Sequence, residues 1–265
     1  MQATPSIEQL ISLEGKRALI TGAAGGIGRA IAWRYAEAGA ELQLVDVDAA
    51  TLRATAAELE ATGYRVTSYV IDLSRKEQID TLWAQLAGCE PDILVNNAGV
   101  YPFREFAGAD EAFCRQVMEI NYFSVSWMCQ QMICRRHKRG GVIINLGSIE
   151  AVLPFKEDLA HYSVSKAGVI ALTRALAKEY ARHGFRVNAI LPGGILTPGT
   201  KAAAKQVLRF RFDLIKTGIE FSQRLPVGRV GQPDEVARLA LVLASDLATY
   251  VHGVAIPVDG GFLAA

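Results

Sequence analysis

The sequence predicts an α/β protein: a doubly wound, Rossmann-like domain in which helices cover both faces of a parallel sheet. Three observations support this. Short segments rich in Val, Ile and Leu alternate with longer segments of helical periodicity. Polar or glycine-rich residues directly follow most of the apolar segments. With 265 residues, 51% of them hydrophobic, the chain can bury a large core. We therefore expect a single domain over residues 1–265.

The expected elements follow from the periodicity and from helix-capping residues. The strands are expected at Arg17–Thr21, Glu41–Asp46, Arg65–Ile71, Ile93–Asn96, Val142–Leu146, Phe185–Leu191 and Val254–Val258. The helices are expected at Gly26–Ala38, Ala49–Thr62, Ser74–Ala87, Asp110–His137, His161–Arg182 and Asp234–Ala244. Ser74 and Glu77 have the spacing of a capping box, and Pro233 is placed to begin the last helix.

The charge of the chain gives no reason to expect a nucleic-acid partner. The formal net charge is +1, so there is no global attraction to a polyanion. One basic cluster, Arg135–Arg139, closes a predicted helix, where cations interact favourably with the helix dipole. No recognition motif accompanies it, and we interpret it as a solvated helix end.

Composition also predicts a cytoplasmic protein with no membrane segment and no metal site. The longest uncharged run, Ile120–Cys134, is too short to span a bilayer and is interrupted by polar residues. The N-terminal segment does not resemble a signal peptide. The four cysteines form no C-x-x-C pair, and the four histidines lack metal-ligand spacing.

The polar and glycine-rich stretches should converge at one edge of the sheet. In open parallel sheets, ligands bind beyond the carboxyl ends of the strands. The stretches that directly follow predicted strands are Thr21–Gly28, Asp46–Asp48, Asp72, Asn96–Gly99, Gly147–Glu150 and Pro192–Thr197. We expect them to form one ligand site.

The first of these stretches, T-G-A-A-G-G-I-G, predicts a dinucleotide site. Glycine lets the backbone approach a ligand closely, and the following helix N-terminus attracts a pyrophosphate. Asp46 ends the second strand, 18 residues after Gly28. A carboxylate there can accept hydrogen bonds from ribose hydroxyls and would repel a 2′-phosphate. The sequence therefore predicts NAD(H) rather than NADP(H) as the cofactor.

A candidate catalytic group comprises Tyr162, Lys166, Ser148 and Asn121. Tyr162 and Lys166 lie four residues apart, on one face of a predicted helix. Lowering a tyrosine pKa by about three units needs roughly 4 kcal/mol, which an ammonium at ~4 Å supplies at an effective dielectric constant of ~20. Ser148 could polarise a carbonyl group. Asn121 could join a water relay to Lys166, or could simply pair with backbone in the core.

On these residues the chain resembles the short-chain dehydrogenase/reductase family. The motifs are T-G-x-x-x-G-x-G at Thr21–Gly28, N-N-A-G at Asn96–Gly99, Y-S-V-S-K at Tyr162–Lys166, P-G-x-x-x-T at Pro192–Thr197 and V-D-G-G at Val258–Gly261. Ser148 lies fourteen residues before Tyr162, and the resemblance covers residues 13–265.

The resemblance implies an enzyme that interconverts a secondary alcohol and a ketone by hydride transfer. It implies a catalytic tetrad of Asn121, Ser148, Tyr162 and Lys166, with Tyr162 as the acid/base and Lys166 also holding the nicotinamide ribose. The implied cofactor-binding residues are Gly22, Gly26, Ile27, Gly28, Asp46, Asp72, Leu73, Asn97, Ala98, Gly99, Tyr162, Lys166, Pro192, Gly193, Ile195 and Thr197. Asn96 would support the central strand. It also implies a small-molecule alcohol or carbonyl substrate and a homo-oligomer, a dimer or a tetramer.

The substrate is left open by the sequence. Glu150 either lines the substrate pocket, which would favour a hydroxylated or cationic group, or faces solvent. Tyr101, Pro102, Phe103, Leu153 and Phe155 suggest a partly apolar pocket. The resemblance implies a substrate lid over residues 198–225.

Two other functions compete with this interpretation. A non-catalytic dinucleotide-binding sensor would be favoured by a broken tetrad. A nucleotide-sugar epimerase or dehydratase fits less well, because the chain is short and its glycine pattern differs from G-x-x-G-x-x-G.

Overall fold

In the described part of the chain, seven parallel strands form one sheet, and this confirms the predicted fold class. The computed structural model describes residues 4–197 and 224–265. The strand order is β3-β2-β1-β4-β5-β6-β7. The strands are β1 (Arg17–Thr21), β2 (Glu41–Asp46), β3 (Val66–Val70), β4 (Ile93–Asn96), β5 (Gly141–Leu146), β6 (Phe185–Pro192) and β7 (Ala255–Val258). Their bounds agree with the predicted ones to within one residue at each end.

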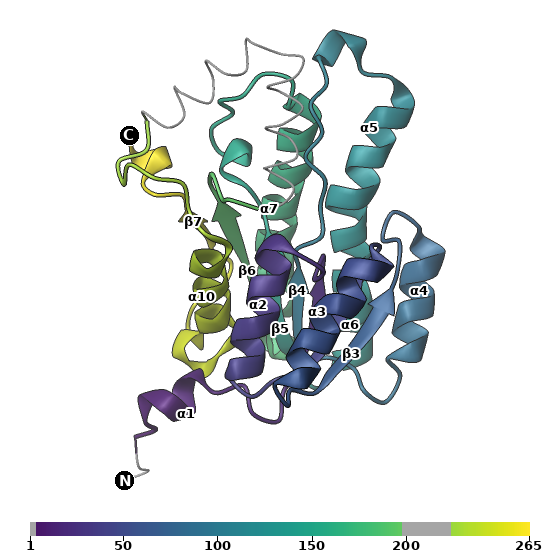
Figure 1. Cartoon of the computed structure of the whole chain (residues 1–265), viewed down its shortest axis with the longest axis vertical. Helices are drawn as coiled ribbons and strands as arrows, with labels where there is room; N and C mark the ends of the chain where they lie inside the picture. Colours follow the sequence, from purple (N-terminus) through teal and green to yellow (C-terminus); the bar gives the residue numbers. More distant parts are fainter. Residues whose placement is uncertain (1–3, 198–223) are drawn as a thin grey trace.

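Helices cover both faces of this sheet, as Figure 1 shows for α2 and α3 in front of the strands and α7 behind them. The α-helices are α1 (Ile7–Ile11), α2 (Gly26–Glu37), α3 (Ala49–Ala61), α4 (Lys76–Gln85), α5 (Glu111–Met118), α6 (Ser124–Arg136), α7 (Ala160–Tyr180) and α10 (Pro233–Ala244). Short 3-10 turns are at Phe106–Gly108, Ile149–Ala151, Ala181–His183, Asp246–Ala248 and Phe262–Ala264.

Alternate residues of β1 enter different hydrophobic cores, and a third, smaller core includes Leu191 of β6. In β1, Ala18 and Ile20 pack with α2, α3 and α10, whereas Leu19 packs with α4, α6 and α7. All three side chains are fully buried. A strand buried on both faces needs an unbroken apolar sequence, which is why the strands read as continuous apolar runs.

The predicted capping box at Ser74 is wrong. Helix α4 begins one residue later than expected, with Arg75 at the N-cap and no side-chain cap. The hydroxyl and the backbone N–H of Ser74 instead donate to Oδ1 of Asp72, at 2.6 and 2.9 Å. A carboxylate two residues away accepts both protons in a local turn, and this turn replaces the cap.

The predicted helix Asp110–His137 is also not continuous. A π-helical segment, Glu119–Phe123, separates α5 from α6. Such a segment adds one residue to a turn and is frequent at functional sites. Asn121 lies inside it and is fully buried.

The basic cluster is not simply a solvated helix end. Arg136 is 7% exposed and donates to Asp92 Oδ1 at 2.7 Å and to the carbonyl of Gly140 at 2.8 Å. Arg139 pairs with Glu90 at 3.0 Å. Two of its cations therefore connect α6 and the chain after it to the segment before β4.

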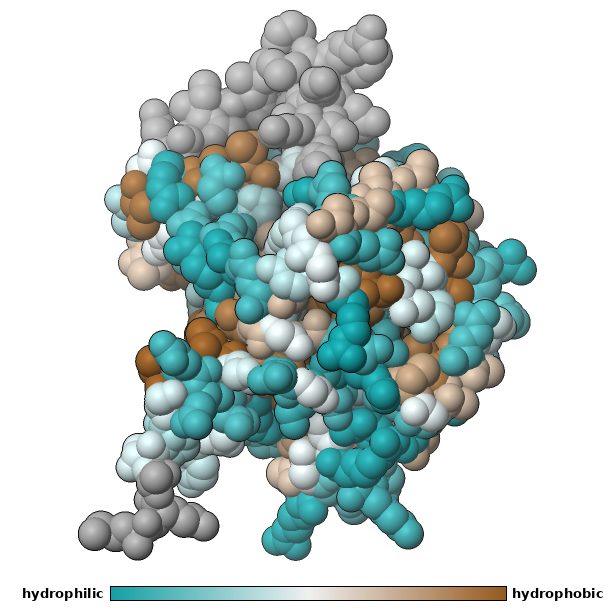
Figure 2. All heavy atoms as spheres, turned by 60° about the horizontal axis from the view of Figure 1, so that its bottom comes forward, coloured by the Kyte–Doolittle hydropathy of each residue, from teal (hydrophilic) through white to brown (hydrophobic). Residues whose placement is uncertain are grey.

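The outer surface agrees with the composition. Figure 2 shows hydrophilic residues over much of the face that it presents, with hydrophobic residues in separate patches. Within residues 4–197 and 224–265, no helix is long and apolar enough to cross a membrane. All four cysteines are free thiols.

Buried polar side chains connect the sheet to α7. The Asn96 amide on β4 donates to Asn145 Oδ1 on β5 at 2.9 Å. The Asn145 amide donates to Thr173 Oγ1 on α7, also at 2.9 Å. All three residues are at most 2% exposed. A buried donor that loses its acceptor carries its full desolvation cost, so this chain of bonds fixes α7 against the strands.

We expect Thr173→Val to reduce the free energy of unfolding by about 1–3 kcal/mol, because the Asn145 amide loses its acceptor. Denaturant titration followed by circular dichroism measures the loss. Thr81→Val is the matched control: its hydroxyl also donates to the carbonyl four residues earlier, at 2.8 Å, but it is exposed. Thr81→Val should reduce the free energy of unfolding by less than about 0.5 kcal/mol. Equal losses in the two variants would contradict the structural role of this network.

Candidate functional site

A glycine-rich turn joins β1 to α2 at the point where the strand order reverses. Gly22 has φ +64° and Gly26 has φ +55°, a region that glycine adopts without strain. A Cβ on Gly28 would overlap the carbonyl oxygen of Gly22 and lie 2.6 Å from the Asn97 amide nitrogen. Gly28 therefore permits close packing beneath the turn, and it does not itself line the cavity described below.

The turn is fixed to the end of β4 by Thr21 and Asn97. Thr21 Oγ1 accepts from the backbone N–H groups of Asn97 and Ala98, at 3.0 Å each. The Asn97 amide donates to the carbonyls of Thr21 and Gly22, at 2.9 and 3.0 Å. These bonds hold the carboxyl ends of β1 and β4 together and direct the N-terminus of α2 toward the cleft.

Asp46 lies at the end of β2, beside this turn. Its Oδ2 accepts from the backbone N–H of Ala24, and its Oδ1 from that of Asp48, at 3.0 Å each. Both bonds hold the carboxylate at the rim of the cleft, where the sequence places it.

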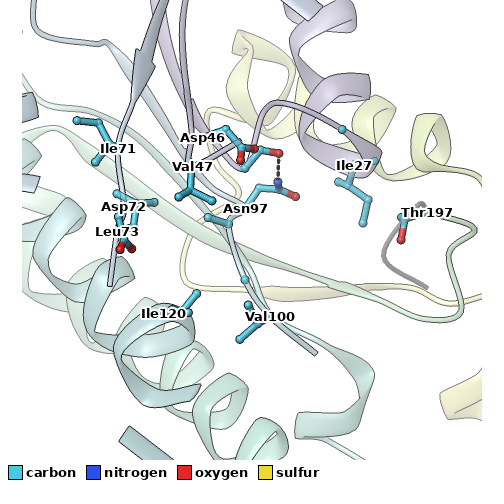
Figure 3. A pocket seen from close by; sticks show the side chains of 15 residues that line it. Ile27, Asp46, Val47, Ile71, Asp72, Leu73, Asn97, Val100, Ile120 and Thr197 are labelled. Atoms are coloured by element: carbon cyan, nitrogen blue, oxygen red, sulfur yellow. Dashed lines mark hydrogen bonds between the residues drawn. The ribbon is translucent and has the colours of Figure 1, made fainter. Parts of the chain in front are cut away.

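A cavity of about 520 Å³ extends from the turn along the carboxyl ends of β1, β2 and β4 (Figure 3). Its lining is Gly22, Gly25, Gly26, Ile27, Asp46, Val47, Ile71, Asp72, Leu73, Asn97, Ala98, Gly99, Val100, Ile120 and Thr197. It brings together ten of the predicted cofactor residues. Val47 lies within the expected stretch Asp46–Asp48. The apolar residues Ile71, Val100 and Ile120 were not predicted, although Ile71 and Val100 adjoin expected stretches.

A second cavity, of about 550 Å³, shares five of these residues and continues the cleft toward α7. Its lining is Ile27, Asn97, Gly99, Val100, Tyr101, Pro102, Leu146, Gly147, Ser148, Ile149, Glu150, Phe155, Lys156, Tyr162, Lys166, Pro192, Gly193, Gly194, Ile195 and Thr197. The apolar residues expected here are only partly confirmed, since Phe103 and Leu153 do not line it. Lys156 was missed because it lies in a loop without a motif.

Ser148, Tyr162 and Lys166 meet in the second cavity. Ser148 follows β5, and its side chain is hydrogen-bonded to the Tyr162 hydroxyl. Lys166, one helical turn after Tyr162 on α7, is 4% exposed and donates from Nζ to the carbonyl of Leu146 at 2.8 Å. The carboxyl end of β5 therefore contacts both members of the Tyr-x-x-x-Lys pair.

The expected lowering of the Tyr162 pKa is not found. Burial raises the pKa of Tyr162 to about 12, and only the hydrogen bond with Ser148 opposes this rise. Burial also lowers the pKa of Lys166 to about 8. The physical reason is that exclusion of water disfavours the charged form of each group. At neutral pH Tyr162 therefore carries its proton.

Asn121 lies next to this group but does not line either cavity. Its Oδ1 accepts from the backbone N–H of Val100 at 2.8 Å, and its amide donates to the carbonyl of Val100 at 3.0 Å. The amide also donates to Ser165 Oγ at 3.3 Å, so both ends of the side chain have partners within the protein. A Cβ on Gly99 would lie 3.1 Å from Asn121 Oδ1 and 3.4 Å from Lys166 Nζ, so the two side chains flank Gly99.

The structure decides the position of Glu150 but describes little of the predicted substrate lid. Glu150 is 2% exposed and lines the second cavity, so the pocket interpretation is correct. Of the predicted lid, only Arg224 and Leu225 belong to the described residues; residues 198–223 lie outside them.

Comparison with known proteins agrees with this geometry. The family model described as enoyl-(acyl carrier protein) reductase matches residues 22–263. The chain is 38% identical to galactitol 2-dehydrogenase (L-tagatose-forming) of Cereibacter sphaeroides, over 94% of this chain and 96% of that protein. It is 36% identical to a short-chain dehydrogenase/reductase of Aspergillus oryzae, over 96% of this chain and 97% of that protein.

A solved structure extends the agreement to three dimensions. It is a putative NAD(P)-dependent gluconate 5-dehydrogenase from Beutenbergia cavernae with bound NADP at low occupancy. The TM-score is 0.89 at 33% identity, over 97% of this chain and all of that one. Fold, site and sequence similarity agree: the chain belongs to the short-chain dehydrogenase/reductase family of oxidoreductases.

Proposed function

We propose that this protein is an NAD(H)-dependent oxidoreductase that interconverts a secondary alcohol and a ketone, with Tyr162 as the acid/base. The observation that carries the proposal is the continuity of the two cavities. It joins a cleft lined by the glycine-rich turn and Asp46 to a buried tyrosine that is hydrogen-bonded to Ser148. A non-catalytic sensor would not need this second part.

The residues of the first cavity fit a dinucleotide. The glycine-rich turn and the N-terminus of α2 provide N–H groups for a pyrophosphate. We propose that Gly22, Gly26, Asp46, Asp72, Leu73, Ala98 and Thr197 contact the cofactor directly, and that Gly28 contributes through the turn. A bound nicotinamide would exchange a hydride with the carbinol carbon of the substrate.

The second cavity supplies the proton chemistry. In reduction of a ketone, Tyr162 would donate its proton to the carbonyl oxygen as negative charge develops there. Ser148 would donate a hydrogen bond to the same oxygen. Lys166 would interact with the resulting phenolate and with the ribose. The raised pKa of Tyr162 agrees with the donor role, because the protonated form is the one required.

Asp46 supports NAD(H) as the cofactor, although a solved relative holds NADP. Among the described residues that line the first cavity, none is a lysine or an arginine that could pair with a 2′-phosphate. A carboxylate in this position repels such a phosphate and accepts hydrogen bonds from ribose hydroxyls.

We further propose a cytoplasmic homotetramer. The free thiols agree with a reducing compartment. Phe123, at the π segment before α6, and Val164 on α7 are exposed apolar side chains that a neighbouring subunit could cover.

We expect wild-type kcat/KM to be higher with NAD+ than with NADP+, and Asp46→Asn to reduce the ratio of the two values at least about tenfold. The substitution keeps an acceptor for the turn and removes the repulsive charge. Asp48→Asn is the control, because it removes the same charge two residues away, outside the cavity lining, and asparagine still caps α3. A wild-type preference for NADP+ would refute the assignment.

We expect Tyr162→Phe to lower kcat by at least about 10²-fold, the range attributed to general acid–base catalysis, with little change in NADH affinity. Steady-state kinetics and NADH fluorescence titration measure the two quantities. Tyr180→Phe, at the far end of α7, removes a hydroxyl from a half-buried tyrosine and should leave both unchanged. Near-normal turnover of Tyr162→Phe is the result that excludes Tyr162 as the acid/base.

A further inference from the structure

Glu150 is a buried carboxyl group that the proposed hydride and proton transfers do not use. It lies in the 3-10 turn Ile149–Ala151, two residues after Ser148, and its backbone N–H donates to Ser148 Oγ at 3.2 Å. It lines the same cavity as Ser148 and Tyr162, and its charge acts on Tyr162 and on Tyr101. Its carboxyl group is therefore placed on the substrate side of the cleft.

One carboxylate oxygen of Glu150 is committed to the protein and the other is not. Oε2 accepts from the backbone N–H of Phe155 at 3.2 Å, and the carboxylate also accepts from the backbone N–H of Lys156. Oε1 is buried and has no hydrogen-bond partner within the protein. An unpaired buried acceptor costs about 1–3 kcal/mol, and more when it is charged, so the site strongly favours a donor at this point.

The charge around Glu150 decides which kind of donor fits. The Lys156 ammonium interacts electrostatically with the carboxylate. Its Nζ also lies 5.4 Å from the Tyr101 ring centre and 5.3 Å from that of Phe155. Because this ammonium already stabilises the carboxylate, a cationic ligand gains less there than it would beside an isolated carboxylate. A neutral hydroxyl satisfies Oε1 without adding a charge to a buried site.

We propose that Glu150 is a specificity-determining residue whose Oε1 accepts a hydrogen bond from a second hydroxyl of the substrate. The enzyme then selects polyhydroxylated substrates, in which a carbon next to the reacting carbinol or carbonyl carbon also carries a hydroxyl. This inference rests on the proposed function. The physical basis is that a site built around a buried acceptor rejects an analogue that cannot pair with it.

The test compares butane-2,3-diol with butan-2-ol, which share a carbon skeleton and differ by one hydroxyl. We expect wild-type kcat/KM with NAD+ to be at least about 100-fold higher for the diol. Glu150→Gln should reduce this ratio at least about tenfold. Its amide oxygen can still accept from the loop N–H groups, while its NH2 group replaces the free acceptor with a donor. Glu157→Gln, an exposed residue of the same loop, is the matched control and should keep the wild-type ratio.

Equal kcat/KM values for the two alcohols in the wild type, or an unchanged ratio in Glu150→Gln, would overturn the specificity role alone. Absence of NAD-linked turnover with either alcohol would contradict the proposed function itself. The two failures are therefore distinguishable.

The pH dependence of the wild-type ratio tests the same role without a substitution. Burial raises the pKa of Glu150 to about 6, against the opposing effects of Lys156 and of the two backbone donors. Below that pH the carboxyl group binds a proton and becomes a weaker acceptor. We expect the preference for the diol to fall as the pH decreases from 7 to 5 in the wild type, and to stay constant in Glu150→Gln. If the wild-type ratio of kcat/KM for the diol to that for butan-2-ol stays constant from pH 7 to 5, the specificity role of Glu150 is contradicted. The other groups that act on its charge or contact it, Tyr101, Tyr162 and Ser148, do not titrate there.

Discussion

The whole site depends on the bonds that Thr21 and Asn97 make between β1 and β4. A parallel sheet leaves the carboxyl ends of its strands at one edge, and a cleft opens where the strand order reverses. The hydroxyl of Thr21 and the amide of Asn97 together satisfy five backbone groups at this reversal. They fix the glycine turn, the direction of α2 and the segment from Asn97 to Val100. Both cavities are built on that segment.

Burial is the second determinant of the site, because it stabilises the neutral form of three ionisable groups. It raises the pKa of Tyr162 and of Glu150 and lowers that of Lys166. Each change favours the neutral form over the charged one. The cavity thus favours protonation of the phenol that would donate to a ketone. Burial therefore explains why a lysine one helical turn away does not by itself make a tyrosine acidic.

The second cavity surrounds Ser148, Tyr162 and Lys166 with side chains from the segments after β4 and β5. Tyr101, Glu150 and Lys156 are among these side chains, and they contact or influence one another.

The sequence by itself determined the fold class, the positions of the strands and most of the residues of the cleft. It could do so because buried parallel strands need continuous apolar runs, and because the glycine turn and the strand ends are local in sequence. Asp46, Asn97 and Tyr162 were all identifiable in this way.

Only the tertiary structure decided features that depend on residues distant in the chain. The π segment at Asn121 and the pairing of that residue with Val100 arise from packing between α5, α6 and the chain after β4. The direction of the Tyr162 pKa follows from burial, which spacing cannot reveal. The placement of Glu150 in the pocket required the turn after β5, because strand alternation no longer applies where the strand has ended. These features depend on three-dimensional packing and burial, which the local sequence pattern does not contain.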